Sequence, residues 1–158
     1  MGSMARQVRA AQERQEAPEH PAGPSCVLVR SGSGHAYEGQ QRLQYLEGVS
    51  AQSAGSGALC LTLLTVPPGG QSAAHLHESH ESAAYVISGS GEMFHGERLR
   101  QRMTFGPGDF VFIPAGAPHV VRNTSPTDPL VGILARTDPN EQESVVLLPE
   151  LESAVPER

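Results

Sequence analysis

The sequence has few of the residues that several classes of protein depend on. Its 158 residues include no tryptophan, only 4% aromatic residues and two cysteines, Cys26 and Cys60. Two cysteines do not make a disulfide framework, and Cys60 stands in an apolar run, where a small buried thiol is expected. There is no run of about 18 apolar residues to cross a membrane, and no apolar signal core near the start. We therefore expect a cytoplasmic protein with free thiols and no membrane partner.

Positive charge is scarce as well. The chain carries 11 lysine and arginine residues against 17 aspartate and glutamate residues, which gives a formal net charge of −6. Nucleic acids and anionic membranes are bound through basic patches. This balance argues against either of them as a partner.

The length predicts one domain, because 158 residues suffice for a single core and no internal repeat occurs. Residues 1–24 are polar and are expected to form a flexible tail, since they carry almost no apolar surface to offset the entropy of ordering. Residues 1–3 resemble a cloning remnant before a native start at Met4. The domain is assigned to residues 25–150, and residues 151–158 form the C-terminal end.

Short apolar segments, separated by glycine and proline, dominate the rest of the chain. Segments of about 4–8 residues that recur at intervals of about 8–12 residues are typical of an all-β sandwich or barrel. The stretches 30–39 and 51–57 are expected to be loops. Strands are predicted around His75 and His77 and over residues 25–29, 41–48, 58–66, 84–88, 92–95, 99–105, 110–113, 119–123 and 130–135.

Aromatic side chains are expected on the inside of this barrel. Inward faces of a small barrel pack into a core or line a ligand cavity. Alternation places Phe110 and Phe112 on one face of their strand. The residues expected in the core or cavity wall are Tyr85, Phe94, Phe105, Phe110 and Phe112.

The segment SVVLLPEL, at residues 144–151, is apolar without polar alternation. It must bury somewhere, either across the barrel or against a second subunit. Together with the edge strands of an open barrel, this segment predicts a homodimer.

Histidines are concentrated in one part of the chain, since five of the seven fall between Gly69 and Asn123. His75 and His77 are separated by one residue, so in a strand both imidazoles point to the same side. His119 follows a turn-rich stretch that can deliver a third imidazole to the same place. Imidazole and carboxylate ligands suit Fe, Mn, Ni, Co, Cu or Zn, so one divalent transition metal is the expected cofactor.

Two segments resemble the two-motif pattern of the cupin superfamily. The segment GGQSAAHLHESHESAAYVISG begins at Gly69 and matches the first motif through Glu81, with one residue more than usual before Gly89. The second motif is matched at every position by Gly108, Pro114, Gly116, His119 and Asn123. The resemblance implies an all-β, cupin-like jelly-roll barrel (a double-stranded β-helix) in which His75, His77 and His119 bind a metal.

The fourth ligand position has three candidates. Glu81 satisfies the shorter spacing that the family allows, and a β-bulge near Ser82 would absorb the extra residue and turn Glu81 inward. Counting back from Gly89 instead places Ser82, a poor ligand, where many cupins have a carboxylate. His80 is the third candidate, since imidazole is an ordinary transition-metal ligand. Glu81 is preferred on the bulge argument, and its alternative is a surface pair with His80.

Catalytic groups beyond the ligands are less sharply indicated. Glu81 and His95 are the candidates for acid–base work. His95 lies two residues after Met93 on the next strand, where it either lines the pocket or is an ordinary half-buried histidine, and the second interpretation is favoured.

The resemblance also bears on function, because cupins include dioxygenases, isomerases, epimerases, lyases and polyketide cyclases. Three or four protein ligands leave open positions on an ion that accepts more, which is what catalysis needs. A small metal-dependent enzyme is therefore expected, with dioxygenase-type chemistry on Fe favoured and isomerase or cyclase chemistry next. The mostly apolar barrel favours an organic substrate, aromatic or β-dicarbonyl. The alternative is a non-catalytic module that binds or senses a small molecule around a structural metal, and a storage role ranks third.

Overall fold

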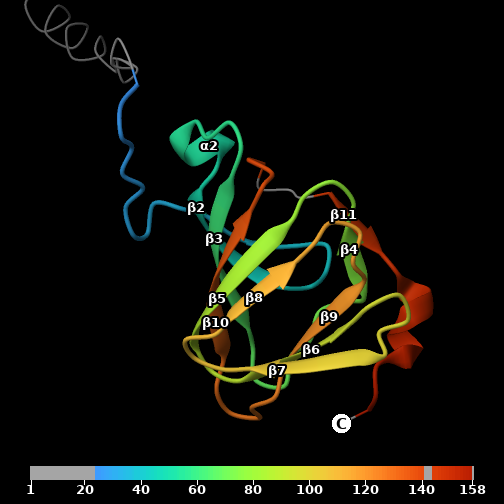
Figure 1. Cartoon of the computed structure of the whole chain (residues 1–158). Helices are drawn as coiled ribbons and strands as arrows, with labels where there is room; N and C mark the ends of the chain where they lie inside the picture. The colour runs from blue at the N-terminus through green and yellow to red at the C-terminus, as the bar shows by residue number, and fades with distance from the viewer. Residues whose placement is uncertain (1–23, 141–143, 158) are drawn as a thin grey trace, which may run out of the picture.

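The computed structural model describes residues 24–140 and 144–157, and it shows two antiparallel β-sheets packed face to face (Figure 1). The larger sheet has the strand order β1-β2-β3-β10-β5-β8, and the smaller sheet has the order β11-β4-β9-β6-β7. The all-β prediction is confirmed. A flexible tail is predicted over residues 1–24, and residues 1–23 lie outside the described part of the chain. The elements are β1 (Ala36–Glu38), β2 (Gln44–Val49), α2 (Ala51–Ala54), β3 (Cys60–Val66), β4 (His75–His77), β5 (Ser82–Ser88), β6 (Gly91–His95), β7 (Gln101–Phe105), β8 (Phe110–Ile113), β9 (His119–Asn123), β10 (Leu130–Arg136), β11 (Val145–Leu147) and the 3-10 helix η1 (Pro149–Ala154).

Alternate side chains of both sheets form a hydrophobic core between them. Val86, Val111 and Leu134 come from the larger sheet, and Met93 and Val121 from the smaller. Each of these side chains is at least nine-tenths buried, and full burial of such a side chain contributes about 1.5–3 kcal/mol. Because strands alternate with a period of two, the other half of each strand faces away from this core.

Three stretches differ from the sequence-based expectations. Residues 25–29 form no strand, because an apolar run becomes a strand only where a sheet edge accepts it. The expected loop 30–39 contains β1, and the expected loop 51–57 contains the short helix α2. The Ser50 hydroxyl starts α2 by accepting hydrogen bonds from the backbone of Gln52 and Ser53. No helix in the part of the chain that the structure describes is long and apolar enough to cross a membrane.

The apolar C-terminal segment is buried within its own subunit. Its first part is β11, which pairs with β4 at the edge of the smaller sheet. Its second part places Leu148 and Leu151 against Phe94 and Val120 on the outer face of that sheet. The argument for a homodimer from this segment is therefore wrong, because the segment already has an intramolecular partner.

The expected position in the core or cavity wall holds for Phe105, and Phe94 is buried in the cluster on the outer face of the smaller sheet. The expectation fails for Phe110 and Phe112, while Tyr85 borders the cavity but is partly exposed. Phe105 packs against the core. Phe110 is 82% exposed, Phe112 is 61% exposed and Tyr85 is 41% exposed. Alternation does put Phe110 and Phe112 on one face, but that face is the outer one, because the other two residues of β8 take the inward positions.

Candidate metal centre

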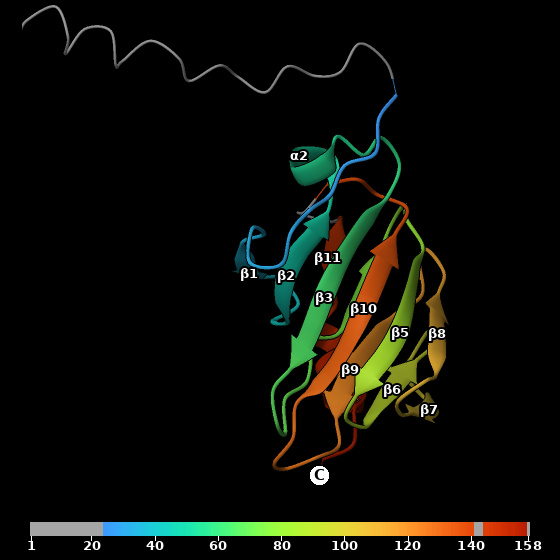
Figure 2. The same cartoon turned by 90° about the vertical axis from the view of Figure 1, so that its left-hand side faces the viewer.

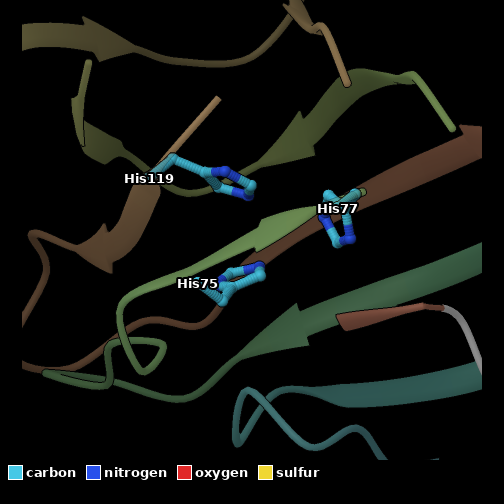
Figure 3. A group of neighbouring side chains, drawn as sticks. All are labelled: His75, His77 and His119. Carbon is cyan, nitrogen blue, oxygen red and sulfur yellow. The ribbon is translucent and has the colours of Figure 1, made fainter. Parts of the chain in front are cut away.

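Three histidines from two neighbouring strands converge (Figure 3). His75 and His77 stand at the two ends of β4, and His119 is the first residue of β9. His75 and His119 are register partners in the β4–β9 ladder, so their side chains leave the sheet on the same face. The alternation of the H-x-H segment adds His77 to that face. The structure thus brings together the three histidines that the sequence nominates as ligands.

The dimensions of this cluster suit a single ion. One ring nitrogen from each histidine lies within 4.8 Å of the other two, and the three residues are 2%, 4% and 2% exposed. Metal–imidazole bonds are about 2.0–2.1 Å long, so two nitrogens on one ion stand at most about 4.2 Å apart. Small side-chain adjustments therefore suffice for the three histidines to bind one divalent transition metal.

Backbone carbonyls set the orientation of two of the rings. His75 Nδ1 lies 2.8 Å from the carbonyl oxygen of Ala73, and His119 Nδ1 lies 2.9 Å from that of Ala117. A carbonyl oxygen only accepts, so Nδ1 carries the proton on both rings. The lone pair of each ring is then on Nε2, as metal ligation through that atom requires.

The second sequence motif shapes the turn that presents His119. Gly116 has φ of 73°, a left-handed conformation that glycine adopts without strain. Its backbone N–H donates to the carbonyl of His77 at 2.7 Å, which ties the turn directly to β4. Asn123, at the other end of β9, donates through Nδ2 to three backbone carbonyls, those of Val66, Pro67 and Asp128. These motif residues hold the scaffold of the centre.

Glu81 lies outside the cluster. It is exposed, whereas Ser82 beside it is only 2% exposed. The β-bulge expected near Ser82 is not observed, because β5 pairs with β8 in continuous register from Ser82 to Tyr85. The irregularity lies further along, where the pairing of β5 with β10 skips Ile87. Alternation from Ser82 onward therefore keeps Glu81 on the outer side, and its expected inward turn does not occur.

Ser82 occupies the position that counting back from Gly89 assigns to the carboxylate. It lines the same cavity as the three histidines. Its Oγ is buried and has no hydrogen-bond partner among the described residues. A buried hydroxyl without a partner is costly, so Ser82 Oγ is able to hydrogen-bond a polar atom of a molecule in the cavity.

His80 is buried next to the cluster without joining it. It is 2% exposed, and its ring centroid lies 4.6 Å from that of His77. Its Nδ1 lies 3.9 Å from a carboxylate oxygen of Asp138 and 3.5 Å from Ser144 Oγ. The surface pair considered for His80 and Glu81 is ruled out by this burial.

His95 shares a sheet face with the cluster but lies beyond it. It is the register partner of His119 in the β6–β9 ladder, so both side chains project on the same side. His95 is half-buried and does not line the cavity at the three histidines. The favoured interpretation, an ordinary half-buried histidine, agrees with this position.

A small apolar cavity lies against the histidines, with a volume of about 50 Å³. Its wall includes Tyr45 of β2, which sequence reasoning missed although the alternation of Leu43 and Tyr45 could have revealed it. The Tyr45 hydroxyl accepts a hydrogen bond from Gln41. Other apolar residues in the wall include Leu64, Val86, Met93, Phe105, Ile113 and Leu134.

The two facing sheets and the buried histidines define a jelly-roll protein with a candidate metal centre inside its barrel. Comparison with known families agrees, since residues 62–135 match the family model described as the cupin domain. Residues 62–135 are therefore similar to the cupin domain, in agreement with the two sequence motifs.

Individual relatives are distant. Quercetin 2,3-dioxygenase of Bacillus subtilis is 29% identical over 119 residues, which cover 75% of this chain and 34% of that enzyme. Oxalate decarboxylase from Bacillus subtilis superposes with a TM-score of 0.65 at 23% identity, over 83% of this chain and 34% of that one. An uncharacterized double-stranded β-helix protein from Klebsiella pneumoniae gives a TM-score of 0.55 at 19% identity, over 75% of this chain and 89% of that one. The chain spans about a third to a half of the length of the curated relatives it matches.

Proposed function

We propose that this protein is a small metal-dependent enzyme that acts on a small organic substrate, with dioxygenase-type chemistry favoured and isomerase or cyclase chemistry next. The observation that carries the proposal is the placement of three buried histidines against an apolar cavity. A cytoplasmic location remains a prediction from the sequence.

His75, His77 and His119 would hold the metal through Nε2, and Fe is the favoured ion. A bound divalent ion supplies Lewis acidity and, for Fe, redox chemistry. The carbonyls of Ala73 and Ala117 keep two of the rings in the required tautomer. Because Glu81 points away, the protein contributes three ligands and leaves several coordination positions for water, oxygen or substrate.

Ser82 is proposed to orient whatever occupies one of these open positions. Its buried hydroxyl can donate a hydrogen bond to an oxygen atom of a molecule in the cavity, which would satisfy the serine. A carboxylate at this position would instead compete for the ion. Ser82 therefore acts as a positioning residue and not as a ligand.

The size and lining of the cavity narrow the substrate class. One water molecule needs about 10–15 Å³, so a cavity of about 50 Å³ favours a small substrate over a large one. The apolar wall disfavours a charged or sugar-like molecule. Of the two substrate classes expected from the sequence, an open-chain β-dicarbonyl fits this space better than an aromatic compound. The similarity to a quercetin dioxygenase supports oxygen chemistry but not its larger substrate.

Oxygen uptake tests the proposal. The Fe-loaded protein should consume O2 when 2,4-pentanedione is added, and neither chelated protein nor the His77→Ala variant should do so. Binding of the diketone without O2 uptake or isomerisation would favour the alternative of a non-catalytic sensing module. A negative result with protein of verified metal content would contradict the dioxygenase assignment for this substrate class.

A further inference from the structure

The outer face of the larger sheet carries a continuous row of apolar side chains. Leu46, Leu63, Ile133, Tyr85 and Phe110 are successive register partners on five neighbouring strands. Direct partners project on the same face of a sheet, so these five form one stripe across it. A second stripe runs parallel to the first through Leu61, Ala135, Ala83 and Phe112. Neither stripe contains a charged residue.

The β5–β8 end of this face is open to solvent. Phe110, Phe112, Tyr85 and Ile87 are 82%, 61%, 41% and 45% exposed. The rings of Tyr85 and Phe110 lie 4.9 Å apart and form an exposed aromatic pair. Figure 2 looks onto this face and shows β10, β5 and β8 side by side in front of the smaller sheet.

The other apolar faces already have a cover. The C-terminal segment packs on the outer face of the smaller sheet. Residues 29–32 and Gly34 line one pocket together with Leu46, Leu61 and Leu63, at the β2–β3 end of the larger sheet. Within the described residues, the face at β5 and β8 has no such cover.

We infer that this face of β5 and β8 binds the same face of a second copy of the chain. The residues of the two stripes carry no charge, so they offer no ion pairs to a different partner, whereas an apolar surface complements itself under a two-fold axis. Aromatic residues are enriched in protein–protein interfaces, and tyrosine is among the residues that anchor them. The face also lies on the opposite side of the sheet from the cavity, so pairing leaves the histidines untouched.

The area supports a second copy. Aromatic side chains bury about 150–250 Å² each, so the exposed parts of Phe110, Phe112 and Tyr85 amount to roughly 370 Å². That is close to half of the about 800 Å² that each partner contributes to a standard interface. Ala83 and Ile133, which stand in the two stripes, extend the apolar surface beside them.

The chain's own first 23 residues are a poorer occupant. They contain no leucine, isoleucine or aromatic residue. Such a segment offers little apolar surface to cover two phenylalanines. The experiment below nevertheless separates this occupant from a second copy.

Tryptophan fluorescence gives a local test, because the natural chain contains no tryptophan. In full-length Phe112→Trp protein, emission should shift to the blue as concentration rises, in parallel with the formation of dimer in sedimentation. Emission that stays independent of concentration would overturn the inference. So would a red shift on deletion of residues 1–23 in monomeric protein, which would identify the tail as the cover.

Charge substitution tests the same face independently. Phe110→Glu should weaken dimerisation by at least about 30-fold, as loss of an interface anchor does. Leu59→Glu is the matched control, since Leu59 is also an exposed apolar residue, at 49%, but lies outside the face. Ile87→Ser serves as a second variant should Phe110→Glu fail to fold by circular dichroism. A monomeric natural protein at micromolar concentration, or equal dimerisation of all variants, would refute the inference.

Discussion

His75 and His119 lie directly opposite each other in the β4–β9 ladder, and each donates Nδ1–H to the carbonyl of the residue two positions earlier in the chain. The same local device therefore orients two rings on two strands. The ring centroids stand 4.2 Å apart. The backbone thus fixes both rings before any ion arrives, which lowers the ordering cost of metal binding.

The substitutions His75→Ala, His77→Ala and His119→Ala should each reduce metal affinity by at least about 100-fold. Mutation of a residue that only hydrogen-bonds a metal ligand costs about 10–100-fold, and loss of the ligand itself should cost more. Metal content by mass spectrometry and affinity by calorimetry measure the effect. His35→Ala is the control, since His35 is exposed and hydrogen-bonds Glu47. Full metal content in both the His77→Ala and His119→Ala proteins would end the metal-site proposal.

Glu81→Ala should leave metal affinity unchanged, because Glu81 is exposed. Ser82→Glu should destabilise the metal-free protein by placing a carboxylate in an apolar cavity, and should increase the stabilisation that added Zn²⁺ provides. Melting temperatures with and without the ion report both effects, with Ser82→Ala as the size-reduced control. A loss of metal in Glu81→Ala would restore Glu81 as a ligand and contradict the placement described above.

Metal binding should weaken as the pH falls. Protons and the ion compete for the same imidazole nitrogens, so affinity is retained above the ordinary imidazole range near about 6.5 and is lost below it. Titration of metal-loaded protein with acid, followed by the release of ion to a chromophoric chelator, gives the profile. Retention of the ion well below this range at low ion concentration would argue against a centre built from histidines.

Leu151→Ala should lower the free energy of unfolding by about 1–2 kcal/mol, less than a fully buried leucine because Leu151 is only partly buried. Leu151 packs in the outer cluster with Phe94 and Val120. Leu147→Ala is the control, since Leu147 is 45% exposed and its substitution should change the free energy of unfolding little.

Removal of residues 144–158 should lower the free energy of unfolding more than Leu151→Ala does. It should also reduce metal affinity, because β11 pairs with the strand that carries His75 and His77. Urea denaturation and metal titration check both, and a neutral truncation would contradict them.

Much of the fold follows from the sequence because glycine and proline separate its strands clearly. β8 and β9 begin and end at the predicted residues. The helix α2 was missed because it has only four residues and depends on the cap by Ser50. The strand β1 was missed because three residues carry too little pattern.

The sequence could not decide which face of a strand is inward. On β8 both alternating pairs are apolar, so alternation gives the spacing of Phe110 and Phe112 but not their side. The same limit affected Glu81, whose orientation depends on where β5 becomes irregular. That irregularity lies at Ile87, and its position is set by pairing with a strand that comes much later in the chain.

The pairing of β4 with β11 has a consequence for the order of assembly. β4 has only three residues; one of them is paired with β9 and all three are paired with β11. During translation β4 leaves the ribosome long before β11 is made, and contacts between such distant segments form late in folding. The centre therefore matures after synthesis of the barrel, and an ion that reaches the nascent chain earlier meets histidines on a strand that still lacks its principal neighbour.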